Sequence, residues 1–212
     1  MEKKYKLTDE TISVDGRTLY RIEALRDFGD VKKGDKGGFI EKEENLSQNG
    51  NCWVYDNAMV YGNAKVFGNA RVRNNAQVYG KAQISDNAKV CNKARIYGNA
   101  VIYEDAMVYD KANIYDDAEV YGKAMVYGNA EIFGKAKVYG IAEIYGKAKV
   151  YGEAWVYGNA KVYDFALVFD VAKVYGSAEV FGSAVVYDNA WVYGNAKIFG
   201  SAEVCGKAQI CG

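Results

Sequence analysis

Histidine and proline are absent from the 212 residues of this chain, and threonine occurs only at Thr8, Thr11 and Thr18. Without histidine, the chain lacks the side chain that most often acts as a general base near neutral pH and that commonly binds catalytic zinc. The absence of proline suits strands whose backbone N–H groups must all be paired. The scarcity of threonine excludes the regular array of small hydroxyl groups that an ice-binding face would need.

Net charge is also missing, since 27 acidic side chains balance 27 basic ones. A neutral chain has no general electrostatic attraction to nucleic acid or to an anionic membrane, so we expect neither as a partner. No apolar run is long enough to span a bilayer, and no signal-peptide core follows Met1. We therefore expect a cytoplasmic protein.

What the sequence has instead is a six-residue repeat that runs from Cys52 to Gly212 without insertion or deletion and reads most clearly as Ala-x-Val-Tyr-Gly-Asn. Every sixth residue from Ala58 to Ala208 is alanine, and the residue two places after each alanine is always valine or isoleucine. A fixed short period indicates a solenoid of stacked units, and six-residue periods are typical of β-helices. The sequence therefore predicts an all-β solenoid.

Each unit is predicted to be a short strand followed by a corner. Alanine and valine lie two positions apart, so both point inward on an extended strand, while the residue between them and the aromatic residue after valine point outward. The last two positions are mostly glycine, asparagine, aspartate or lysine, and glycine, asparagine and aspartate adopt left-handed backbone at little cost.

The outward residues indicate how many units make one coil. With two units per coil, lysine would stack on lysine, beginning with Lys137 on Lys149. With three units, opposite charges alternate along one column, which reads Glu143, Lys161, Glu179 and Lys197. Lysine alternates with tryptophan along another column, which reads Lys137, Trp155, Lys173 and Trp191. We therefore predict a triangular prism of about nine coils, ~43 Å long.

The first 51 residues precede the repeat. Residues 1–30 are predicted to form a small β-hairpin appendage that turns at Asp15 and Gly16. Residues 31–51 are predicted to close the N-terminal end of the solenoid, where they would protect the strand edges. Ile40 and Leu46 precede Ala58 by multiples of six residues, so the repeat places them at the alanine position. Larger residues at this position suit an end coil, where no full neighbouring coil fills the prism. Residues 52–212 are the solenoid itself.

The repeat resembles that of the hexapeptide-repeat left-handed β-helix superfamily, which places an aliphatic residue inside and a small residue four positions later. Val54 with Ala58 follows that rule, and so do the later units. The resemblance implies a single-stranded left-handed coil, which the period alone does not determine. Residues 31–46, which read VKKGDKGGFIEKEENL, also resemble the leader of uncharacterised bacterial and phage-encoded hexapeptide-repeat proteins.

The same resemblance implies which residues catalysis would need. Acyltransferases of the superfamily are expected to use a histidine as general base, and its carbonic anhydrases bind zinc through histidines, so a chain without histidine is expected to perform neither reaction. We expect no catalytic residue and no cofactor. Asp86 and Asn87 stack under Glu104 and Asp105, and their oxygens would suit calcium. Turn geometry is the better explanation of these corner residues, so no metal site is predicted.

The four cysteines are expected to stay reduced. Cys52 points inward, whereas Cys91, Cys205 and Cys211 take the outward aromatic position on three different columns. No pair can then reach the Cα separation of ~4.4 to 6.8 Å that a disulfide requires. Free thiols fit an intracellular setting.

The position after valine is aromatic in most units, which predicts three outward ladders of stacked rings. One ladder reads Tyr109, Tyr127, Tyr145, Tyr163, Phe181 and Phe199. Two interpretations remain open. The ladders shield the backbone at the corners and fix the register, or they present a recognition surface for a protein, a glycan or nucleic-acid bases.

One part of the repeat is more apolar than the rest. Phe165 and Val171 replace polar corner residues, and other apolar residues lie outward between them or one coil away. Such an exposed patch indicates an interface with a partner. The predicted partner-binding residues are Phe165, Leu167, Phe169, Val171, Val185, Tyr187 and Tyr151.

The last unit, which contains Ile210 and Cys211, is an ordinary repeat. Its strand edge would be covered by a second copy, continued by further chain, or left solvated as a site prone to aggregation. Together with the apolar residues around Leu167, this edge leads us to expect self-association, most simply as a homodimer.

Three functions remain open. The leading one is a non-catalytic scaffold or binding module that recognises a protein partner through its aromatic-rich faces. The second is a phage-encoded inhibitor or sequestering protein that acts against a host defence component, as the leader resemblance suggests. The third is a divergent hexapeptide acyltransferase, which binding of acyl-CoA would reveal.

Overall fold

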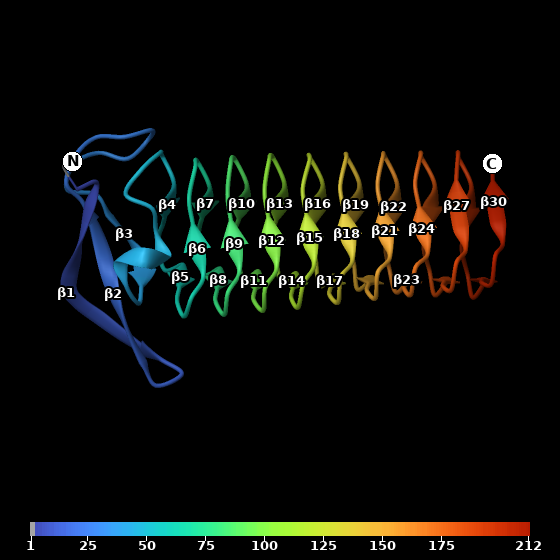
Figure 1. Cartoon of the computed structure of the whole chain (residues 1–212), viewed down its shortest axis with the longest axis horizontal. Coiled ribbons are helices and arrows are strands. Elements are labelled where there is room, and N and C mark those ends of the chain that lie inside the picture. The colour runs from blue at the N-terminus through green and yellow to red at the C-terminus, as the bar shows by residue number, and fades with distance from the viewer. Residues whose placement is uncertain (1–2) are drawn as a thin grey trace.

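The computed structural model describes residues 3–212, which form a triangular β-solenoid with a β-hairpin at its N-terminal end (Figure 1). Three sheets run along the solenoid as its faces, and each turn of the chain adds one short parallel strand to each face. The predicted all-β solenoid with three-sided coils is confirmed. Within residues 3–212 the helical structure is limited to the short 3-10 helix η1 (Glu43–Asn45), and no helix is long and apolar enough to cross a membrane.

The hairpin face is the twelve-stranded sheet that includes the N-terminal hairpin. Its strands in spatial order are β1 (Tyr5–Val14), β2 (Arg17–Ala24), β3 (Lys36–Ile40), β5 (Met59–Val60), β8 (Gln77–Val78), β11 (Arg95–Ile96), β14 (Asn113–Ile114), β17 (Glu131–Ile132), β20 (Lys149–Val150), β23 (Leu167–Val168), β26 (Val185–Val186) and β29 (Glu203–Val204).

The other two faces are nine-stranded sheets. The lysine–glutamate face consists of β4 (Trp53–Val54), β7 (Arg71–Val72), β10 (Lys89–Val90), β13 (Met107–Val108), β16 (Met125–Val126), β19 (Glu143–Ile144), β22 (Lys161–Val162), β25 (Glu179–Val180) and β28 (Lys197–Ile198). The tryptophan face consists of β6 (Lys65–Val66), β9 (Gln83–Ile84), β12 (Val101–Ile102), β15 (Glu119–Val120), β18 (Lys137–Val138), β21 (Trp155–Val156), β24 (Lys173–Val174), β27 (Trp191–Tyr193) and β30 (Gln209–Cys211).

The register of these strands confirms both predicted columns. Glu143 pairs with Lys161, and the lysine Nζ lies 3.0 Å from a carboxylate oxygen of that glutamate. Lys173 pairs with Trp155 on one side and with Trp191 on the other, and its Nζ lies 5.0 Å from each indole ring centroid. Opposite charges and cation–π contacts therefore join successive coils on the outside.

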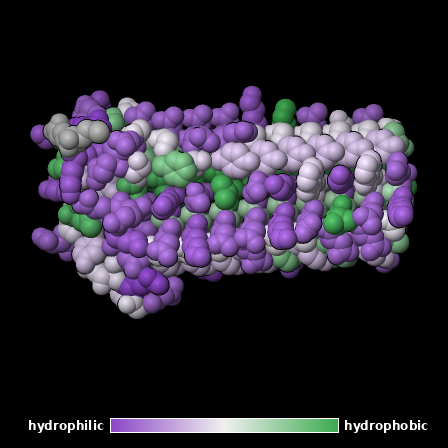
Figure 2. Space-filling model, viewed as in Figure 1, coloured by the Kyte–Doolittle hydropathy of each residue, from purple (hydrophilic) through white to green (hydrophobic). Residues whose placement is uncertain are grey.

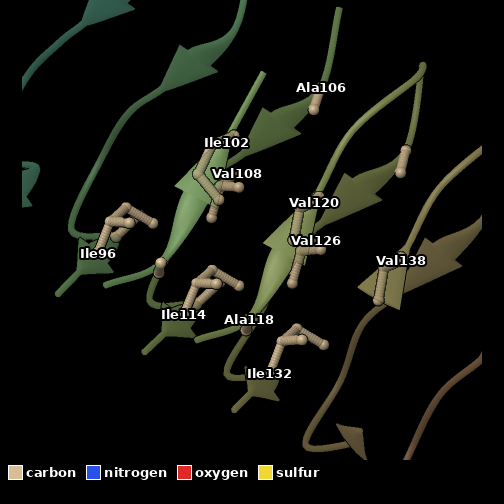
Figure 3. Packing of buried hydrophobic residues seen from close by; sticks show 14 of the residues in the cluster. Ile96, Ile102, Ala106, Val108, Ile114, Ala118, Val120, Val126, Ile132 and Val138 are labelled. Carbon is tan, nitrogen blue, oxygen red and sulfur yellow. The ribbon is translucent and has the colours of Figure 1, made fainter. Parts of the chain in front are cut away.

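The core is a narrow column of alanine, valine and isoleucine side chains, which are fully buried from Ala58 to Val192. In Figure 3, Ile96, Ile114 and Ile132 lie in one row along the axis, while isoleucine and valine from the tryptophan face lie in another. Branched side chains fill the prism at one position of each unit, and alanine leaves room for them at the other. The inward assignment of both positions is confirmed.

The corners depend on left-handed backbone at the first corner position, the residue directly after the aromatic one. Glycine takes this position most often, and Gly158, for example, has φ +72°, where a Cβ would meet Gly176 N at 3.0 Å. Where aspartate takes the position, its carboxylate gains a partner in the next coil, as when Asp164 Oδ2 accepts a hydrogen bond from Gly182 N at 3.3 Å. The second corner position carries no such constraint.

The N-terminal segment adds an irregular turn to the nine regular ones. β3 pairs antiparallel with β2 and parallel with β5, so the hairpin extends the hairpin face and covers its first edge. Ile40 pairs with Val60, and Leu46 bridges Val66, so both residues take the valine phase. The expectation that they take the alanine phase is wrong, because the segment from Leu46 to Val54 is two residues longer than a repeat unit.

The end of the prism beside the hairpin is closed by large side chains. The Trp53 ring is fully buried between Tyr5 and Phe28, with centroid distances of 6.0 and 5.3 Å and edge-on geometry in both pairs. Lys4 is buried as well, and its Nζ donates to Cys52 O at 2.9 Å and lies 3.3 Å from Cys52 Sγ. Burial lowers the pKa of Lys4, because desolvation disfavours the ammonium form.

Candidate interaction surface

The outward residues on the C-terminal half of the hairpin face form one column that is apolar in the middle and charged at both ends. Lys149, Leu167, Val185 and Glu203 follow one another in this column, each paired with the next through neighbouring strands. Strands in a sheet lie ~4.8 Å apart, so the four side chains span a short stretch of the face. Leucine and valine therefore lie side by side between a cation and an anion.

A column of aromatic rings runs beside these residues. The Phe169 ring stacks on Tyr151 with a centroid distance of 4.8 Å and on Tyr187 at 5.2 Å. The same ladder continues without a break from Tyr187 back to Tyr61 beside the hairpin. Figure 2 shows side chains of similar hydropathy in rows along the long axis, as such columns require. The predicted outward ladders are present.

Two apolar corner residues frame this part of the face. Phe165 is 57% exposed and Val171 is 39% exposed, and both take the second corner position, which the backbone does not restrict. The Lys147 Nζ lies 4.9 Å from the Phe165 ring centroid, and this cation covers one side of the ring. The chain therefore keeps large apolar side chains where a polar residue would fold equally well.

All seven predicted partner-binding residues thus lie together on the hairpin face, and we call them the apolar patch. They are Phe165, Leu167, Phe169, Val171, Val185, Tyr187 and Tyr151. Ile141, which is 55% exposed, lies apart at the corner between β18 and β19. Ile210 and Cys211 lie in β30 on the tryptophan face, where both are exposed.

From the sequence, no role was assigned to the charges that surround the apolar patch. Lys149 forms an ion pair with Glu131 at 3.1 Å, and Glu153, at the corner before the tryptophan face, pairs with Lys135 at 3.2 Å. Glu203 and Lys207 take the matching positions at the other end of the patch. The eighteen-residue offset that revealed the columns would also have found these residues.

The sequence reasoning also missed a basic corner farther toward the N-terminus. Lys93 and Lys111 occupy successive second corner positions and line a hollow of about 380 Å³ together with Asn92, Asp110 and Asn129. A neighbouring hollow of about 370 Å³ adds Arg95. Like charges stack here, whereas on the C-terminal half of the lysine–glutamate face lysine stacks on glutamate. This corner could attract a small anion.

The corner residues considered for calcium form hydrogen bonds to the next coil. Asp86 Oδ2 accepts a hydrogen bond from Glu104 N at 3.1 Å, and Asn87 donates to Asp105 Oδ1 at 3.1 Å. Glu104 in turn accepts from Gly122 N at 2.8 Å. Within residues 3–212 no group of three potential metal-ligating side chains comes together. The four cysteines do not pair with one another in this part of the chain.

The ladder tyrosines are held in their neutral form. Burial, and after it the hydrogen bond to Glu179, raises the pKa of Tyr163 to about 12, and the Tyr163 hydroxyl donates to that carboxylate at 3.1 Å. Burial and Glu119 raise the pKa of Tyr103 to about 12, and burial and Glu131 do the same for Tyr115. A proton on each hydroxyl lets the ring stack in the ladder and still donate to a carboxylate.

The fold and these surface columns define the chain as a β-solenoid repeat protein. Residues 94–110 match the family model described as YdcK Beta solenoid repeat. A stretch of 68 residues is 41% identical to the "Uncharacterized acetyltransferase YdcK" of Escherichia coli (strain K12), which corresponds to 28% of this chain and 21% of that protein. The match therefore spans about a fifth of the length of that relative, and it supports a shared solenoid repeat.

Proposed function

We propose that this chain is a non-catalytic β-solenoid module that binds a protein partner through the apolar patch. The patch itself is the observation that carries the proposal. Phe165 and Val171 take unrestricted corner positions, so the fold gives no reason for their exposed apolar side chains. A partner would gain by covering them, because burying a side chain the size of leucine or phenylalanine contributes ~1.5 to 3 kcal/mol.

Rigidity supports this proposal. Phe169 is clamped between two stacked rings, and Leu167 lies between paired strands, so little side-chain freedom is left to lose on binding. Aromatic anchors of this kind carry a large share of the energy of protein interfaces. The flat face suits a folded surface better than a small molecule, which prefers an enclosed pocket.

The test compares proteins retained from a lysate of the native host by three versions of the chain. The first is unchanged, the second carries Phe165→Asp and Leu167→Asp, and the third carries Ile141→Asp. Ile141 is as exposed as Phe165 but lies on another corner, so it is a matched control. We expect a partner to be retained by the first and third versions and lost by the second. Equal retention by all three would refute the proposal.

A second candidate is an acyltransferase, because the matched relative carries the name acetyltransferase. The basic corner at Lys93 and Lys111 adds support, since cations at a hollow would suit the phosphates of acyl-CoA. Saturable binding of acetyl-CoA that Lys93→Glu abolishes would favour this candidate. We expect no transfer of the acetyl group, since the chain has no histidine to serve as base.

A further inference from the structure

We infer that the partner of the apolar patch is a second copy of this chain, and that the two solenoids pair antiparallel about a two-fold axis between β23 and β26. This inference rests on the proposed function, because it names the partner of the same surface. It is carried by the order of charges along the hairpin face, which is complementary to itself when the direction of one solenoid is reversed.

Two flat faces can pair about a two-fold axis in two ways. The axis lies in the plane of the interface and runs either along the solenoid or across it. With the axis across the solenoid, each corner meets the same corner of the second copy, while the order of coils is reversed. Placed between β23 and β26, the axis sets Leu167 opposite Val185 of the second copy, so that apolar meets apolar.

The charges at both ends of the apolar patch then match. One coil outward from Leu167 and Val185, Lys149 lies opposite Glu203 of the second copy. At the corner beside the tryptophan face, Glu153 lies opposite Lys207 of the second copy. By symmetry each contact occurs twice. Opposite charges thus border the apolar centre, an arrangement that fixes register and orientation.

Two of the alternative arrangements bring like charges together. A shift of the axis by half a coil, onto β23, sets Glu131 opposite Glu203 and Lys135 opposite Lys207. An axis along the solenoid sets Lys149 opposite Lys149 of the second copy, and it sets Glu203 opposite Glu203 of the second copy. Like charges face to face at an interface disfavour the arrangement. The antiparallel register between β23 and β26 has neither conflict.

Among residues 3–212, the rest of the fold leaves this surface free. The hairpin lies at the other end of the prism, so it does not cover β20, β23, β26 or β29 (Figure 1). The overlap covers four coils, or ~19 Å at the usual strand spacing. An interface this short belongs to the weak, transient class, so the pairing is expected at high micromolar concentration and above.

The first experiment exchanges charges and measures association by sedimentation equilibrium. Lys149→Glu alone sets carboxylate against carboxylate, and Glu203→Lys alone sets ammonium against ammonium, so each variant should associate at least about tenfold more weakly. A mixture of the two variants restores opposite charges at both contacts and should associate like the unchanged chain. Lys197→Glu, on the lysine–glutamate face, is the control that should change nothing.

The second experiment reads the register by oxidative cross-linking. Cys91, Cys205 and Cys211 are first replaced by serine, and Leu167→Cys and Val185→Cys are then introduced in separate chains. Cross-links should form readily only when the two chains are mixed. Stronger linking of the Leu167→Cys chain to itself would overturn the register, and a monomer at high micromolar concentration would overturn the pairing. The retention experiment with the native host would still decide whether a different protein binds the apolar patch.

Discussion

At the scale of single residues, the geometry of the corners explains why so many acidic side chains lie at turns. Asp188 adopts φ 56°, and its carboxylate accepts a hydrogen bond from Gly206 N at 3.0 Å. Glycine provides the left-handed backbone alone, whereas aspartate also satisfies an N–H group of the next coil. An acidic corner therefore helps the stacking of coils, as the turn interpretation of these residues predicts.

The ladder tyrosines predict how stability depends on pH. An unfolded tyrosine titrates near ~10, whereas Tyr103, Tyr115 and Tyr163 titrate near about 12 in the fold. Because the pKa of these tyrosines is higher in the folded chain than in the unfolded one, their contribution to the free energy of unfolding is fully present below pH ~10. It is lost as the pH rises through about 12. We expect alkaline unfolding in this window, measured by circular dichroism and tyrosinate absorbance.

Phenylalanine at these three positions separates titration from packing. Phe133 and Phe181 already occupy ladders, so a phenyl ring fits the stack. A variant with Tyr103, Tyr115 and Tyr163 all changed to phenylalanine should melt close to the unchanged chain at pH 7 and unfold at higher pH. An unchanged alkaline midpoint would show that the raised pKa values do not drive the transition.

At the scale of elements, each coil contacts mainly its neighbours, so a substitution that destabilises one end should leave the distant coils stable. Trp53, in β4, is buried against Tyr5 and Phe28, and Trp53→Ala should lower the free energy of unfolding of this end by ~3 to 5 kcal/mol. We expect faster hydrogen exchange in the hairpin and the first coils, and unchanged exchange around β23. Mass spectrometry of peptides from both regions measures this directly.

Trp191 offers a control of the same residue type. Its ring lies outward on the tryptophan face and contacts Lys173 and Tyr175. Trp191→Ala should therefore leave exchange in the hairpin unchanged and cost less than Trp53→Ala. Loss of protection along the whole solenoid after Trp53→Ala would mean that the coils unfold as one cooperative unit.

The sequence could predict the repeating elements because their constraints are local and strict. Alanine and valine alternate with outward residues, and the charge order along the column from Glu143 to Lys197 required three-sided coils. The left-handed sense came from the family resemblance, since either hand has the same period. The N-terminal turn was harder, because the two extra residues before Val54 shift the phase of Ile40 and Leu46.

The candidate surface was only partly predictable, for a related reason. Phe165 and Val171 stand out in the sequence because they break a polar pattern, and the structure places them on one face. Glu203 and Lys207 do not stand out, since charged residues are ordinary on an outward strand. Their proposed role follows only from their place on the same face as the apolar patch, which depends on how coils distant in the sequence stack.

At the scale of the whole molecule, deletions of six and of eighteen residues should affect the core and the surface differently. Removal of residues 107–124 takes out one coil and should shorten the distance between spin labels at Thr18 and Ser183 by ~4.8 Å, with the hairpin and the apolar patch still on one face. Removal of residues 107–112 takes out one unit and should also leave a folded solenoid, because alanine and valine keep their phase. Unfolding of either variant would contradict this expectation.

The nine regular turns therefore have two periods. The period of six residues sets which side chains enter the core, and the period of eighteen residues sets which side chains share a face. An insertion or deletion whose length is a multiple of six but not of eighteen keeps the inward positions in phase. It rotates everything beyond it about the solenoid axis by one or two thirds of a revolution. The hairpin and the apolar patch share a sheet only because the chain advances by a multiple of three units from β5, which adjoins the hairpin strands, to β23. A gain or loss of one unit would point the patch in a new direction while every buried side chain kept its place.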